Sequence, residues 1–129
     1  MNITPIKRIV LCTLLFALWL PSALAQSLPP LSGRVIDAAG ILSPNVEQQL
    51  ASKLAAHEAK SGNQIVVYTI NDLNGRTIEG EALRLLRGWG LGQADLNNGV
   101  LFMIAKNDRK IRIETGYGVE GTLTAAIAS

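Results

Sequence analysis

The chain has 129 residues, with 12 Lys and Arg against 10 Asp and Glu, and it contains a single Cys. Two of the basic residues and the Cys lie within the first 25 residues, so the remainder carries ten charges of each sign and no thiol. The lack of Cys excludes thiol chemistry and disulfide bonds in the remainder. The equal numbers of positive and negative charges argue against nucleic acid or an anionic lipid surface as a partner.

Residues 1–25 have the order of features of a secretory signal peptide. Lys7 and Arg8 precede an apolar run over residues 9–20, which is too short to span a bilayer. Pro21 and small residues then lead to a cleavage site between Ala25 and Gln26. An uncleaved N-terminal anchor or a buried helix is the alternative interpretation. The signal peptide predicts an exported protein, periplasmic or otherwise extracytoplasmic.

The remainder is predicted to be a proline-containing leader, 26–33, followed by one domain, 34–129. Residues 34–37 are a short apolar piece, expected as an edge strand or an extended arm. Ser43 and Pro44 are typical of a helix N-terminus, and Gly62 is typical of its end. The almost continuously apolar run 64–70 predicts a central strand covered on both faces.

The second half of the domain again alternates between a predicted helix and predicted strands. Thr77 is a candidate N-cap for a second helix, and residues 100–105 predict a second buried strand. After the polar turn 106–109, residues 110–115 alternate, with isoleucines on one side and charges on the other. This alternation predicts an antiparallel partner with one solvated face, joined as a hairpin.

The order of elements predicts an α/β fold, a three-layer sandwich with a mixed, mostly parallel sheet between helices that ends in a β-hairpin. A third helix would begin near Thr122 and has barely started at Ser129. We therefore expect the domain to be truncated at its C-terminus and the natural protein to be longer.

A glycine motif over residues 116–121 fits G-x-G-x-x-G, but its context argues against NAD. The strand before it is amphipathic and ends a hairpin, and Glu120 would place a carboxylate beside the pyrophosphate. We interpret the motif as a tight strand-to-helix turn. The single His57 and the lack of Cys after residue 25 argue against zinc and against nucleophilic catalysis.

Single acidic residues follow the predicted strands. Asp72 and Asp108 come after the two apolar strands, and Asp37 precedes the first helix. If those strands are parallel, the three carboxylates share the edge where ligands bind in open α/β sheets. Carboxylates suit Ca²⁺ or Mg²⁺, although single acidic residues in turns also serve simply as turn formers.

Four stretches together resemble one known family. They are VIDAAGILS (35–43), GWGLG (88–92), NNGVL (97–101) and NDRKIRIETGYGVEG (107–121), and they are similar to the TPM domain family of exported proteins. The resemblance implies an α/β sandwich, a Ca²⁺ or Mg²⁺ site and weak acid phosphatase activity as an alternative function. It also implies assistance to an envelope or membrane-protein partner. A purely structural interaction module remains a further alternative.

Carried over by motif, the resemblance implies Asp37, Asn98 and Asp108 as metal ligands and Arg109 as a phosphate contact. It identifies no catalytic base. Members of the family often continue into a transmembrane helix, and membrane anchoring cannot be judged from this chain.

Overall fold

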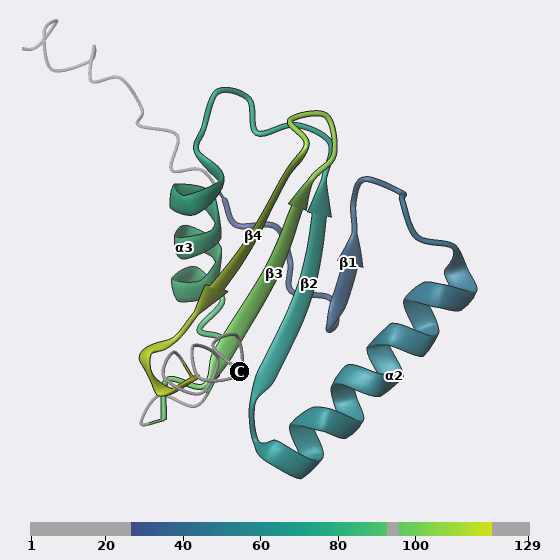
Figure 1. Ribbon diagram of the computed structural model, residues 1–129, viewed down its shortest axis with the longest axis vertical. Coiled ribbons are helices and arrows are strands. Elements are labelled where there is room, and N and C mark those ends of the chain that lie inside the picture. The colour runs from purple at the N-terminus through teal and green to yellow at the C-terminus, as the bar shows by residue number, and fades with distance from the viewer. Residues whose placement is uncertain (1–26, 93–95, 120–129) are drawn as a thin grey trace, which may run out of the picture.

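The computed structural model describes residues 27–92 and 96–119 (Figure 1). Its elements, in chain order, are β1 (Val35–Asp37), α2 (Pro44–Ser61), β2 (Gln64–Ile70), α3 (Ile78–Gly88), β3 (Gly99–Ala105) and β4 (Lys110–Thr115). The predicted signal peptide, its cleavage site and the helix expected from Thr122 lie outside the described residues. None of the helices in the described part is long and apolar enough to cross a membrane.

Both helices begin and end largely as their local sequence predicts. The Ser43 hydroxyl accepts a hydrogen bond from the N–H of Val46, and the Thr77 hydroxyl accepts one from the N–H of Gly80. Gly62 ends α2 in the left-handed conformation, at a φ of 80°. These caps fix where α2 begins and ends and where α3 begins.

The four strands form one sheet in the order β1-β2-β3-β4. β2 pairs in parallel with both β1 and β3, and β3 pairs antiparallel with β4. The predicted α/β class and its mixed, mostly parallel sheet are therefore confirmed, including the terminal hairpin.

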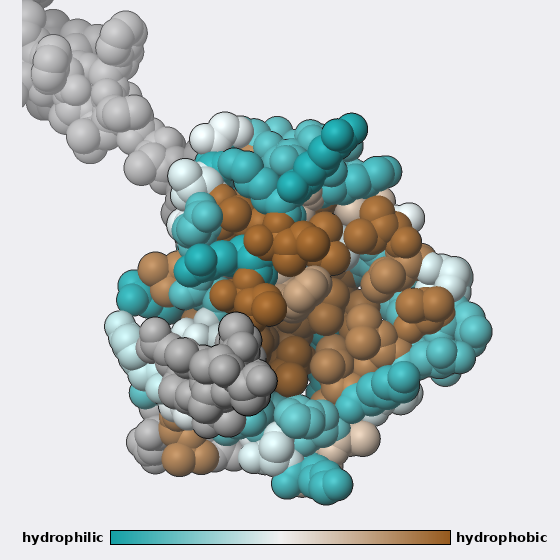
Figure 2. All heavy atoms as spheres, viewed as in Figure 1, coloured by the Kyte–Doolittle hydropathy of each residue, from teal (hydrophilic) through white to brown (hydrophobic). Residues whose placement is uncertain are grey.

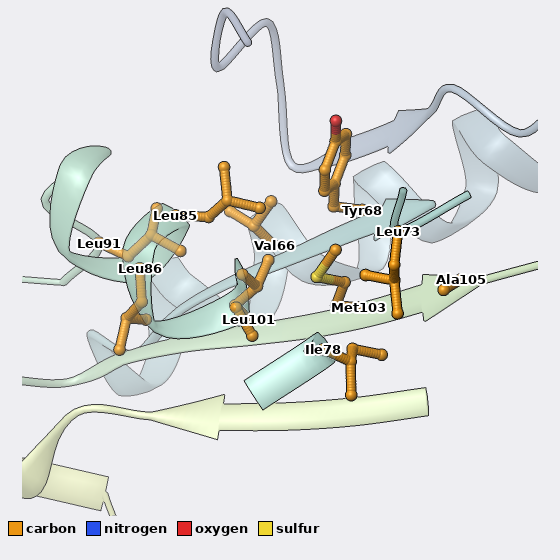
Figure 3. Close-up of a cluster of buried hydrophobic side chains, with 11 residues drawn as sticks. Val66, Tyr68, Leu73, Ile78, Leu85, Leu86, Leu91, Leu101, Met103 and Ala105 are labelled. Atoms are coloured by element: carbon orange, nitrogen blue, oxygen red, sulfur yellow. The ribbon is translucent and has the colours of Figure 1, made fainter. Parts of the chain in front are cut away.

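One face of the sheet carries the main hydrophobic core (Figure 3). Val66 and Tyr68 of β2 and Leu101 and Met103 of β3 point toward α3, which contributes side chains such as Leu85. Leu101, Met103 and Leu85 are fully buried. Burying a side chain of this size stabilises a fold by roughly 1.5–3 kcal/mol, so this layer is the main source of stability in the described domain.

The leader also packs on this face, although its composition predicted little to bury. Leu28 contacts the core cluster and fills the space beside Gly88. The indole N–H of Trp89 donates a hydrogen bond of 2.8 Å to the Pro29 carbonyl, and the Trp89 ring meets Tyr68 edge to face. Residues 27–30 are therefore part of the packed structure.

The opposite face is covered unevenly. α2 contacts β1 and β2, and Val35 and Val67, which point to that face, are both buried although they lie outside the main cluster. α2 itself has no buried residue and contributes half-buried positions such as Leu50 and Leu54. Helices on the two faces give the layered arrangement, with α2 over one side of the sheet only (Figure 1).

The prediction that β3 is covered on both faces is wrong within the described residues. Its side chains alternate between buried and half-buried, so Phe102 and Ile104 remain partly exposed. On the paired β4, Ile111 is 63% and Ile113 43% exposed, while Arg112 and Glu114 on its other side are half-buried. The solvated face of the hairpin is thus its isoleucine face, and Figure 2 shows apolar side chains gathered over the strands and beside α2.

Truncating Leu101 to Ala should lower the free energy of unfolding by about 2–5 kcal/mol, because the fully buried side chain leaves a cavity between sheet and helix. Ile113→Thr is the matched control on the exposed face and should change it by no more than about 0.5 kcal/mol. Urea unfolding followed by circular dichroism measures both. Equal losses in the two variants would contradict the division of the sheet into a buried and an open face.

Candidate functional site

Three loops follow the carboxyl ends of the parallel strands, at the top of Figure 1. They are residues 38–42 after β1, residues 71–77 after β2, and the hairpin turn 106–109 after β3. Two backbone hydrogen bonds of 2.9 Å continue the β2–β3 pairing into the loops, from Lys106 N–H to the Ile70 carbonyl and from Asn107 N–H to the Asn71 carbonyl. This continuation fixes the hairpin turn against the loop after β2.

Asp72 and Asp108 hold this junction together. The Leu73 N–H donates to Asp108 Oδ2 at 2.8 Å, and the Asn107 side-chain amide donates to Asp72 Oδ1 at 3.0 Å. The second oxygen of each carboxylate receives no hydrogen bond from the described residues. The parallel strands therefore bring two carboxylates from separate loops together, as their position in the sequence predicted.

Asp37 lies on the same edge but closes its own loop. Its carboxylate accepts hydrogen bonds from the Thr69 hydroxyl at 2.6 Å and from the N–H groups of Ile41 at 3.1 Å and Leu42 at 2.8 Å. Burial alone would raise the pKa of Asp37, but the hydrogen bonds from Thr69 and from these backbone groups outweigh burial and lower it. Asp37 is thus an anionic cap for residues 38–42, and this role already occupies both of its oxygens.

Asn98 lies at the other end of the sheet. It precedes β3, is 5% exposed, and its side-chain amide donates a hydrogen bond of 2.7 Å to the Gly62 carbonyl. Its own carbonyl accepts one of 3.1 Å from the Gln64 N–H. A strand of this length, roughly 20 Å, separates it from the carboxyl edge. The structure brings Asp37 and Asp108 to one edge and does not bring Asn98 to them.

Arg109 occupies the last position of the hairpin turn with a φ of 54°. Its N–H donates to the Lys106 carbonyl at 3.2 Å, which closes the turn. A side chain in the left-handed region costs roughly 1 kcal/mol relative to glycine. The turn therefore holds a guanidinium next to Asp108 at a position where glycine would fit the backbone better.

The carboxyl edge offers hard oxygen donors, which are the ligands of Ca²⁺ and Mg²⁺. In the described ranges no three His, Cys, Asp or Glu side chains gather as ligands of one ion. A cation there would rely on Asp72 and Asp108, completed by amide and carbonyl oxygens of the neighbouring loops, a set that Ca²⁺ accepts.

A charged cluster beside the core was not anticipated from the sequence. Glu81 of α3 is bound by Arg84, at 2.6 Å and 3.1 Å, and by Arg76, at 3.1 Å. The hydrogen bond from Arg84 lowers the pKa of Glu81 despite burial, and the carboxylate stays charged. The spacing of Glu81 and Arg84 on one helix indicates a pair, but no sequence pattern brings in Arg76 or the nearby Tyr68.

A hollow of about 710 Å³ lies between α3 and β4, at the end of the molecule opposite the carboxyl edge. Arg87 and the ion-paired Arg112 and Glu114 supply its charged lining. We place the candidate site at the carboxyl edge instead, because ligands of open α/β sheets bind outside the carboxyl ends of the strands.

Comparison with known proteins gives one family and several similar solved structures. The family model described as the TPM domain matches residues 35–129. The solution structure of the N-terminal domain of a P. gingivalis protein is 36% identical, with a TM-score of 0.64, and the match covers 70% of this chain and 58% of that one. This chain thus spans less than two thirds of that relative.

The N-terminal domain of a protein from Corynebacterium glutamicum is 21% identical, with a TM-score of 0.62. That match covers 81% of this chain and 68% of the other, and it concerns the fold alone. No curated protein sequence matches this chain.

Replacing Asp37 by Ala should lower the free energy of unfolding by about 1–3 kcal/mol near neutral pH, because Thr69 and two backbone N–H groups lose their acceptor. Since the folded-state pKa lies below the ordinary value, the carboxylate stabilises the fold above that value, and the contribution is lost as pH falls through the folded pKa. Urea unfolding at about pH 7 and about pH 2.5 measures the difference between wild type and variant. A difference that stays constant over this range would contradict the assigned role.

Proposed function

The chain belongs to the TPM domain family, and from that premise we propose that it is an exported module that binds Ca²⁺ or Mg²⁺ and assists an envelope or membrane-protein partner. The observation that supports a cation site is that Asp72 and Asp108 come together at the carboxyl edge. Each has one carboxylate oxygen that accepts no hydrogen bond from a described residue. The expected signal peptide supports export, because it directs the domain out of the cytoplasm.

Asp72 and Asp108 are the residues that would hold the cation, one oxygen each. Asn71 and Asn74 of the adjacent loop offer further side-chain and backbone oxygens of the kind Ca²⁺ accepts. Asp37, at the same edge, serves to order residues 38–42 through its three hydrogen bonds. A cation that links the two loops would make the edge rigid, and a rigid edge is a defined surface for a partner.

The second candidate function is weak acid phosphatase activity, and the position of Arg109 favours it. The guanidinium follows Asp108 directly on the hairpin turn, at a strained backbone position. There it would bind a phosphate group with paired N–H donors. A divalent cation supplies polarisation of a phosphoryl oxygen in such reactions. His57 is exposed on α2, and we assign no residue as a general base for this reaction, so we rank catalysis second.

Thermal unfolding of the exported chain in EDTA, Ca²⁺ or Mg²⁺ tests the cation site. A cation at a hundredfold excess over its Kd should stabilise the fold by about 2.7 kcal/mol, which raises the melting temperature. Asp72→Asn and Asp108→Asn should each remove most of this increase. Glu79→Gln is the matched control, because it makes the same charge change on the exposed first turn of α3.

Melting temperatures that are indifferent to both cations in wild type and in every variant would exclude the cation site. Such a result would leave a purely structural interaction module as the function of the domain.

Hydrolysis of an aryl phosphate tests the second candidate function. Arg109→Gly should abolish hydrolysis and keep the fold, because glycine relieves the left-handed backbone by up to about 1 kcal/mol. A loss of activity with an unchanged or higher melting temperature therefore assigns Arg109 to phosphate binding. Activity that survives both Arg109→Gly and Asp108→Asn would place hydrolysis elsewhere on the protein.

A further inference from the structure

A cavity of about 350 Å³ lies between the leader and the start of α3, on the core face of the sheet. Leader residues 27–30 form one wall, the loop after β2 forms a second, and Glu81 and Arg84 of α3 form a third. Tyr68 also lines this cavity. The cavity thus brings together the charged cluster around Glu81 and the leader segment that follows the predicted cleavage site.

The two arginines of the cluster have N–H groups to spare. Arg84 uses Nε and Nη2 on Glu81, and Arg76 uses Nη1, so Nη1 of Arg84 and Nε and Nη2 of Arg76 find no acceptor among the described residues. The side chains of Arg76 and Arg84 are 40% and 31% exposed. Glu81 neutralises one guanidinium, so the trio keeps one net positive charge beside the cavity.

Tyr68 adds a donor from the floor of the cavity. The residue as a whole is 8% exposed, and its hydroxyl makes no hydrogen bond to another described residue. Figure 3 shows the hydroxyl oxygen at the end of the ring that points away from the other core side chains. Burial and the charge of Glu81 raise the pKa of Tyr68, so the phenol stays protonated and donates at neutral pH. The hydroxyl oxygen is accessible from the cavity, because no buried side-chain N or O atom of the described residues lacks a hydrogen-bond partner.

We propose that this cavity binds a small oxyanion, a phosphate or carboxylate group, held by the Tyr68 hydroxyl and the unused N–H groups of Arg84 and Arg76. All three side chains offer donors to the same space, and the oxygens of one oxyanion can accept from all of them. Arginine binds phosphate and carboxylate alike, through paired N–H groups. The site is separate from the proposed cation site, because it uses neither Asp108 nor Arg109.

Asp72 lies between the two proposed sites, and its charge affects them in opposite ways. It lines this cavity, and its Oδ1 accepts a hydrogen bond from the Asn107 side chain. Its negative charge opposes an anion in the cavity and favours a cation at the carboxyl edge. Asp72→Asn should therefore tighten oxyanion binding and weaken cation binding, and the same variant separates the two proposals.

Fluorescence of Trp89 provides the readout. Trp89 is the single Trp after residue 25, its ring centroid lies 5.4 Å from that of Tyr68, and its indole N–H binds the leader at Pro29. The exported chain is first freed of metal ions with EDTA and dialysed to remove the chelator, whose carboxylates would compete for the cavity. It is then titrated with phosphate, sulfate or acetate, each against chloride at equal ionic strength to remove general screening. The proposal expects a saturable change with at least one oxyanion and none with chloride. The comparison of phosphate with acetate identifies which group the cavity prefers.

Tyr68→Phe keeps the ring and removes only the hydroxyl, so the fold should persist while the Kd rises about tenfold or more. Arg84→Gln should weaken binding at least as much. Arg87→Gln, at an exposed arginine on the same helix that does not line the cavity, should leave the Kd unchanged.

Absence of a saturable response to every oxyanion would overturn the proposal and leave the cluster as a hydrated ion-pair network. A response that is the same in Tyr68→Phe as in wild type would also overturn it. Because the titration is done on metal-free protein, failure of the cation site does not affect either result.

Discussion

The parallel pairing of β2 with β3 determines where everything else in this domain lies. Seven residues pair along the two strands, from Gln64 with Gly99 to Ile70 with Ala105. Backbone hydrogen bonds extend the pairing into the loops at both ends, so the polypeptide beyond each strand is also held in register. A one-residue slip would turn Leu101 and Met103 away from α3 and move every residue of both edges to the wrong face.

This pairing explains the tight contacts at the amino edge of the sheet. Gly99 lies against the backbone of Leu91, and Gly116 lies against the carbonyl of Asn97, so neither position has room for a Cβ atom. The first glycine of the G-x-G-x-x-G motif, Gly116, is therefore required by packing between two backbone segments. Asn98, between the two segments, fixes the end of α2 through the Gly62 carbonyl. The motif residues cluster here for structural reasons, far from the carboxylates at the other edge.

Charged side chains lie on the core face of the sheet, where apolar ones are expected. On β4 the charged pair Arg112 and Glu114 lies on the α3 side, where the two side chains bind each other at 3.0 Å, while the isoleucines face out. Glu81 is likewise placed at the border of the core and is tolerated there because two guanidinium groups surround it. Arg112 and Glu114 therefore neutralise each other, whereas Glu81 with its two arginines leaves one positive charge beside the cavity under the leader.

Local sequence was sufficient for the elements themselves. Ser43, Pro44 and Gly62 define the first helix because caps depend on neighbouring backbone groups, and the apolar run 64–70 defines the central strand because its composition suits burial. The hairpin and the mostly parallel sheet were predicted as well, and the parallel direction of β2 and β3 brings Asp72 and Asp108 to one edge. These features follow from interactions between near neighbours and from the direction of parallel strands.

Only the tertiary structure decided which face of each strand is covered and which distant groups become partners. Sequence motifs grouped Asn98 with Asp37 and Asp108, but a strand connects its first residue to one edge and its last residue to the other, so Asn98 is far from them. Likewise, Arg76, Glu81 and Tyr68 come together because a loop, a helix and a strand pack around the leader. Such contacts depend on packing in three dimensions, and no local pattern of residues encodes them.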